Sequence, residues 1–193
     1  MPPTGLPKES LLSPDARARL LSALLSRAKR NDVQVQQNEG SVPGHGWYSP
    51  SEKLITLGNK GSDDEIPSLA HELGHVELNQ GVVGRVIQSP LARGAAGDAW
   101  MIGGMIGAVA EGSLARRIAL SGGVAAAMQL PLLTGEAVAS IKGHKMLAEY
   151  GAPRELLDLH RKLMLKGFGT YLRPGAVGMA GALTGSTLGA VIS

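Results

Sequence analysis

The chain has 193 residues, enough for one domain with a substantial core, and a formal net charge of only +3. It contains no cysteine, which excludes disulfides and thiolate metal sites. The weak charge and the scarcity of aromatic residues (two Trp, three Tyr, one Phe) argue against nucleic acid as a partner.

The first predicted helix begins at Ser13-Pro14-Asp15, which supplies a cap, a proline for the first helical position and an acid for the first turn. Apolar residues then recur at helical spacing as far as Ala28. Basic residues occupy the remaining positions, and their pattern is typical of a solvated helix face; a juxtamembrane role is the alternative. They are Arg17, Arg19, Arg27, Lys29 and Arg30.

Three short strands are predicted next, over residues 33–36, 47–48 and 54–57. The first alternates apolar and polar residues, and the other two flank a turn at Ser49-Pro50-Ser51. A small sheet in this position would precede the chain's most distinctive helix. Its edge strand could pair with an extended peptide by strand addition. His45 lies in the glycine-rich loop before the second strand, and we interpret it as an exposed loop residue rather than a metal ligand.

The second predicted helix carries the sequence His71-Glu72-Leu73-Gly74-His75. The acidic run 62–65 supplies its start, and Asn79-Gln80-Gly81 can end it. Histidines four residues apart lie on one helix face, so both imidazoles can bind one ion, and zinc suits them. Glu72 is placed to act as general base on a zinc-bound water. Gly74 leaves room for another backbone to approach.

A pair of apolar helices follows, over residues 94–110 and 118–134, joined by a charged break at 111–117. The second has 17 residues without a charge, close to the lower limit of about 17 residues for a bilayer span, whereas Asp98 interrupts the first. Gly103 and Gly107 have the spacing that lets helices pack closely. The pattern predicts a helical hairpin, either in a membrane or in the core of a helical protein, and we favour the membrane.

After the hairpin, Glu136 is expected to open a new helix, and a further helix is predicted over 154–166, ending at Gly167-Phe168-Gly169. The last twenty residues carry no charge, and Gly181, Gly185 and Gly189 recur every four residues. This tail could span a membrane, pack on a partner protein or be disordered. Glycine-rich helices of this kind also suit a homo-oligomer.

A zinc site with two histidines needs a third protein ligand. A third histidine six residues after His75 is absent, because position 81 is glycine, so a carboxylate from a later helix is expected. We choose Glu136, because a hairpin that crosses a bilayer twice returns the chain at this residue to the side of the histidines. The acidic residues that could supply this carboxylate are Asp98, Glu111, Glu136, Glu149, Glu155 and Asp158.

The combination resembles the bacterial membrane-associated neutral zinc metallopeptidases. In that family a strand pair leads into a His-Glu-x-Gly-His helix, apolar helices intervene, and a Glu-x-x-Ala-Ser motif supplies the third ligand. Residues 68–75 match the first motif, and Glu136-Ala137-Val138-Ala139-Ser140 matches the second. The resemblance covers roughly residues 48–172. It implies a zincin-like fold with zinc held by His71, His75 and Glu136, and Glu72 as the base.

The predicted fold is therefore α+β and mostly helical: a short N-terminal sheet, an active-site helix and an apolar hairpin at about 94–134, inserted in a domain of residues 1–172. A glycine-rich tail, 173–193, follows.

The predicted function is a membrane-associated zinc endopeptidase that acts on peptides or proteins. His144, His160 or Tyr171 could stabilise the oxyanion. The alternative is a structural or membrane-inserting protein, such as a phage virion component, that carries a zincin-like module; an inactive chaperone or adaptor is the third interpretation.

Overall fold

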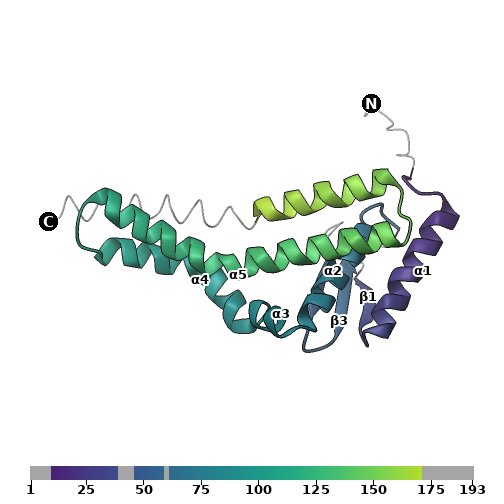
Figure 1. The fold of residues 1–193 in the computed structure, drawn as a ribbon, viewed down its shortest axis with the longest axis horizontal. Helices are drawn as coiled ribbons and strands as arrows, with labels where there is room; N and C mark the ends of the chain where they lie inside the picture. The colour runs from purple at the N-terminus through teal and green to yellow at the C-terminus, as the bar shows by residue number, and fades with distance from the viewer. Residues whose placement is uncertain (1–9, 39–45, 59–60, 171–193) are drawn as a thin grey trace, which may run out of the picture. The chain divides into compact units, whose positions relative to one another are not determined.

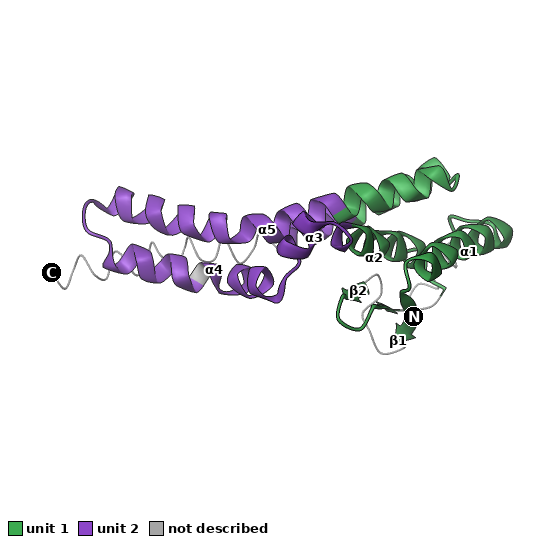
Figure 2. Cartoon of the chain, turned by 60° about the horizontal axis from the view of Figure 1, so that its bottom comes forward, with its two compact units in different colours: residues 1–77, 139–163 green, residues 78–138, 164–193 purple. Residues whose placement is uncertain are grey.

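A computed structural model describes residues 10–38, 46–58 and 61–170 of the chain (Figure 1). His45, Tyr171 and the predicted tail lie outside these residues. The chain divides into two compact units (Figure 2). Unit 1 comprises residues 1–77 and 139–163, and unit 2 comprises residues 78–138 and 164–193. The architecture is α+β and mostly helical, as predicted.

Unit 1 begins with helix α1 (Pro14–Arg30), which starts where the sequence predicts. The Ser13 hydroxyl accepts a hydrogen bond from the Ala16 amide and so satisfies one of the free amides of the first turn. One face of the helix buries Leu20, Leu24 and Ala28. The opposite face is not wholly solvated, which corrects our interpretation of the basic residues: Arg17 pairs with Glu65, and Arg27 pairs with Glu77.

The three predicted strands form one sheet in the order β1-β3-β2, with β1 at Gln34–Asn38, β2 at Gly46–Ser49 and β3 at Leu54–Gly58. β3 pairs in parallel with β1 and antiparallel with β2. Strand β3 is central, and its Ile55 and Leu57 side chains are buried. β1 and β2 are thus the two edges of the described sheet, and Gly46 at the start of β2 lies near Glu72 of the helix that carries the histidines.

Helix α2 (Glu65–Asn79) covers the sheet and is almost entirely buried. Its first residue, Glu65, is only 3% exposed, and its carboxylate accepts hydrogen bonds from the Gln37 amide and the Gly61 backbone as well as from Arg17. A buried carboxylate is tolerated because it is paired and hydrogen-bonded. The core of unit 1 contains apolar side chains from α1, β3, α2, the end of α5 and the helical residues 154–163: Leu20, Leu24, Ile55, Leu57, Ile66, Leu69, Leu73, Met146, Leu147 and Leu156.

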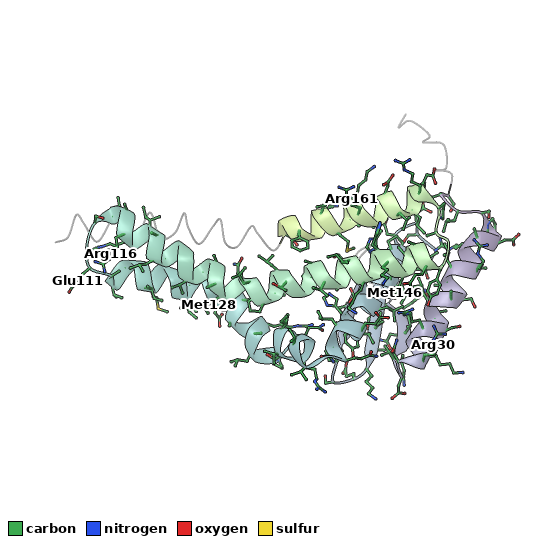
Figure 3. The ribbon with its side chains drawn as sticks, viewed as in Figure 1. Arg30, Glu111, Arg116, Met128, Met146 and Arg161 are labelled. Atoms are coloured by element: carbon green, nitrogen blue, oxygen red, sulfur yellow. The ribbon has the colours of Figure 1, made fainter. Side chains whose placement is uncertain are left out.

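Unit 2 contains the short helix α3 (Val82–Ile87), helix α4 (Pro90–Val109) and the first part of α5 (Leu114–Glu149). The α4–α5 hairpin confirms the predicted pair of apolar helices, and Glu111 and Arg116 lie at its turn (Figure 3). An added Cβ at Gly103 would lie 2.7 Å from the Ser121 carbonyl oxygen, and one at Gly107 would lie 2.9 Å from the Ser121 Cβ. These glycines therefore permit the close helix packing that their spacing predicts.

Two predicted boundaries are wrong. Glu136 does not open a helix, because α5 runs without interruption from Leu114 to Glu149. Pro131 lies inside it: proline removes one hydrogen bond but has a helical φ, and the helix continues. Gly135 packs against Ile87, where an added Cβ would lie 3.1 Å from the Ile87 side chain. Likewise residues 167–169 do not end the last helix, which is helical from 154 to 170.

Candidate metal centre

The two histidines of α2 direct their Nε2 atoms toward a common point. The Nε2 atoms of His71 and His75 are 3.2 Å apart, and the two rings are nearly perpendicular, at 86°. Two nitrogen ligands held about 2.05 Å from one tetrahedral zinc ion lie about 3.3 Å apart. The spacing of the two nitrogens therefore already matches that of ligands that share one ion.

Glu136 joins this pair. The ligand atoms of His71, His75 and Glu136 all lie within 4.8 Å of one another, with His75 buried and the other two half-buried. Within the described part of the chain, this is the one group of three or more such side chains that could hold a metal ion. The other carboxylates that we considered, Asp98, Glu111, Glu149, Glu155 and Asp158, do not belong to it.

A close contact between α2 and α5 holds the histidines in place. An added Cβ at Gly74 would lie 2.8 Å from the carbonyl carbon of Ala139 and still nearer its oxygen, far closer than a real Cβ approaches backbone. One at Gly143 would lie 2.7 Å from the Ala70 carbonyl oxygen. The prediction that Gly74 admits another backbone is confirmed, and the backbone is that of α5. Glycine at these two positions lets the helices touch beside the histidines.

Glu72 lies on the sheet side of the cluster. Glu72 is 6% exposed. An added Cβ at Gly46, the first residue of β2, would lie 3.4 Å from the Glu72 Oε1 atom. The Glu72 carboxylate is therefore adjacent to the start of the edge strand β2.

Ser140 is a site residue whose role the sequence motifs left unspecified. Its hydroxyl oxygen lies 3.3 Å from Nδ1 of His71. Ser140 also follows Glu136 by four residues on α5, so both side chains project from one helix face. The four-residue spacing is visible in the sequence, but it does not identify Nδ1 of His71 as the atom that the hydroxyl contacts.

His160 and His144 form a second pair of imidazoles in unit 1, with ring centroids 5.6 Å apart. His160 is 1% exposed, and its Nε2 atom has no hydrogen-bond partner among the described residues. Burial, together with the nearby His71 and His144 rings, lowers the pKa of His160 to about 4. A neutral, buried imidazole is poorly placed to donate a charge-assisted hydrogen bond, whereas His144 is half-buried on the same helix as Glu136.

The lowered pKa of His160 predicts that the folded chain loses stability in acid. Between the ordinary value of 6.5 and about 4, the unfolded chain binds a proton that the folded chain does not. Stability is therefore unaffected by this group above about pH 6.5 and falls by about 2 kcal/mol at pH 5. Urea unfolding of the metal-free chain at about pH 7.5 and about pH 5 measures the difference. The His160→Gln variant should lose about 2 kcal/mol less than the wild type over this interval; an equal loss would contradict the assignment.

Comparison with known proteins identifies no relative of this chain. No protein-family model matches the chain, and neither a curated protein nor a solved structure matches it. The chain thus has a mostly helical α+β fold in which two histidines and a glutamate could hold one metal ion.

Proposed function

We propose that the protein is a zinc-dependent endopeptidase of the kind that its two motifs resemble. The observation that carries the proposal is the convergence of His71, His75 and Glu136, with their ligand atoms within 4.8 Å, beside the carboxylate of Glu72. Two imidazoles and a carboxylate are a donor set of catalytic zinc sites, which keep one position open. When bound, zinc supplies Lewis acidity that polarises a substrate carbonyl and makes a water more acidic.

Within this proposal, Glu72 moves the proton. Its carboxylate accepts a proton from the attacking water and then delivers it to the departing amine nitrogen. The low solvent exposure of Glu72 supports this role, because a carboxylate in a largely water-excluded site interacts more strongly with the reacting groups. His144 remains a candidate for the stabilisation of the oxyanion.

The edge strand β2 is the proposed binding site of the substrate. It pairs with β3 on one side, and in the described sheet β2 is the strand at the end of the order. A peptide added along it in extended form would have its backbone anchored next to Gly46, where Glu72 lies. Trp47 on this strand is 48% exposed and offers an apolar surface to a substrate side chain.

The activity is tested on the full chain with quenched fluorescent peptide libraries. Zinc-loaded protein should cleave internal peptide bonds, a chelator should stop cleavage, and stoichiometric zinc should restore it. His71→Ala should neither cleave nor recover with zinc. Cleavage that survives both the chelator and His71→Ala would reject a zinc mechanism.

We also propose that the α4–α5 hairpin associates with a lipid bilayer. Among the residues that the structure describes, α5 is the one helix long and apolar enough to cross a membrane, and only 22% of its most apolar window is buried. A core helix of a soluble protein would bury far more. The hairpin exposes large apolar side chains along both helices: Met101, Met105, Val109, Leu120 and Leu130. Helix α4, with 20 residues, is about 30 Å long, which matches the hydrocarbon core.

The bilayer proposal predicts that lysines in the middle of the hairpin detach the chain from membranes. Met101 and Ala126 are exposed, so Met101→Lys with Ala126→Lys should hardly change folding in water. At the centre of a bilayer each lysine costs about 3 kcal/mol, so the double variant should move from the vesicle fraction to the soluble fraction. Flotation with liposomes measures this, and Leu25→Lys on α1 is the matched control. Equal flotation of the double variant and the wild type would exclude insertion.

The exposed hairpin also favours a second candidate function, a membrane-inserting structural protein that carries this site as a module. The two functions differ in copy number and in catalysis. A structural component is incorporated into a particle at fixed stoichiometry, and Glu72→Gln would leave its assembly unchanged. A peptidase is needed in catalytic amounts, and the same substitution removes its effect.

A further inference from the structure

We propose that Ser140 is a positioning residue for the metal site: its hydroxyl accepts a hydrogen bond from Nδ1–H of His71 and so keeps Nε2 of that ring unprotonated and directed at the ion. This inference rests on the proposed metal function. It adds to that function a residue that binds neither the ion nor the substrate.

The direction of the hydrogen bond follows from the geometry. A neutral imidazole carries one proton, on either Nδ1 or Nε2. The Nε2 atom of His71 lies 3.2 Å from the Nε2 atom of His75 and belongs to the cluster that could hold an ion, so Nε2 must carry a lone pair to bind it. The proton is then on Nδ1, which lies 3.3 Å from the Ser140 hydroxyl oxygen. Ser140 is therefore the acceptor, a role that metal-bound histidines commonly need filled.

The packing of α2 on α5 fixes the distance between this donor and this acceptor. Gly74 and Gly143 mark two places where the backbones touch, against Ala139 and Ala70 respectively. Ser140 lies between the two α5 contact residues, and His71 lies between the two α2 contact residues. Neither helix can slide without a clash at one of these contacts, so the hydroxyl is held opposite Nδ1.

The same helix face of α5 also carries Glu136, one turn before Ser140. One turn of helix thus presents the carboxylate to the ion and the next presents the hydroxyl to the ligand His71. Loss of the hydroxyl should leave the ligand set complete but free the ring to adopt the other tautomer and to rotate. Outer partners of this kind typically contribute about 10- to 100-fold in metal affinity.

The test uses the full chain and zinc itself, with a chromophoric chelator as competitor. Ser140→Ala should bind zinc about 10- to 100-fold more weakly than the wild type. Ser140→Thr, which keeps a hydroxyl, should restore most of the affinity. Ser121→Ala removes another buried serine of the same helix, away from the site, and should bind as the wild type does. The cobalt-substituted proteins should show an altered visible absorption spectrum for Ser140→Ala alone, which a general loss of stability would not produce.

A second measurement does not require metal binding. In the metal-free chain at neutral pH, the ring nitrogen shifts of His71 in an NMR spectrum should show the proton on Nδ1, and in Ser140→Ala they should show a mixture of tautomers. If the wild type binds no zinc, the metal function fails. If the wild type binds zinc and Ser140→Ala matches it in affinity, cobalt spectrum and His71 tautomer, the role of Ser140 alone is refuted.

Discussion

Replacing Glu72 by glutamine is expected to slow proteolysis about 10²- to 10⁴-fold while the chain keeps its zinc. The substitution preserves size and hydrogen bonding but removes the group that accepts the proton, and general base catalysis typically contributes about 10²- to 10⁴-fold. We therefore expect kcat to fall by about this factor, with KM nearly unchanged. Peptide cleavage kinetics and zinc content, measured on the same preparation, give the two numbers.

Glu155→Gln is the matched control for this prediction. Glu155 is exposed on the last described helix and was one of the alternative third ligands, yet it does not belong to the metal cluster. Its variant should keep both zinc and turnover. If Glu72→Gln retains the turnover of the wild type, Glu72 is not the base. If the variant loses its zinc together with its activity, the lost activity reflects the ligand set rather than the proton.

Replacing Gly74 by alanine is expected to destabilise the fold and to disrupt the metal site together. In an exposed helix interior this change stabilises by about 1 kcal/mol, because alanine is the better helix former. Here the new Cβ would lie within 2.8 Å of the Ala139 backbone, and backbone cannot move aside as a flexible side chain can. Overpacking of this kind costs about 1–3 kcal/mol or more, so the clash outweighs the propensity gain.

The displacement should also move Ser140 and Glu136 away from the histidines, so zinc affinity should fall with stability. Gly97→Ala is the matched control, since Gly97 is a helical glycine of α4 with open space where its Cβ would lie. Chemical denaturation should show Gly97→Ala at least as stable as the wild type and Gly74→Ala less stable. A stabilised Gly74→Ala variant would mean that α2 and α5 are not in contact at this point.

Local signals in the sequence predicted much of this fold. Ser13 and Pro14 mark the start of α1, and the acidic run and Gly81 bracket α2. The alternation of apolar and polar residues located the first strand, and the turn at 49–51 located the other two. The spacing of His71 and His75 predicted their shared helix face. These features depend on interactions within a few residues, which is why sequence alone could give them.

Features that depend on contacts between distant segments were missed. The sequence predicted a new helix at Glu136, but α5 is continuous through Pro131 and Gly135, and Gly135 packs on Ile87. Arg17 and Arg27 were interpreted as solvated, but they pair with glutamates of α2, 48 and 50 residues away. The partner of Ser140 lies 69 residues away, and no local pattern identifies it.

The zinc content of the purified chain and its variants tests the proposed metal site. The claim is that His71, His75 and Glu136 together bind one ion. Elemental analysis of the purified full chain, dialysed against a weak chelator after loading, should find one zinc per wild-type and per Glu155→Gln chain. It should find little or none in His71→Ala, His75→Ala and Glu136→Ala. A wild-type chain without zinc, or a Glu136→Ala chain with a full equivalent, would contradict the proposed site.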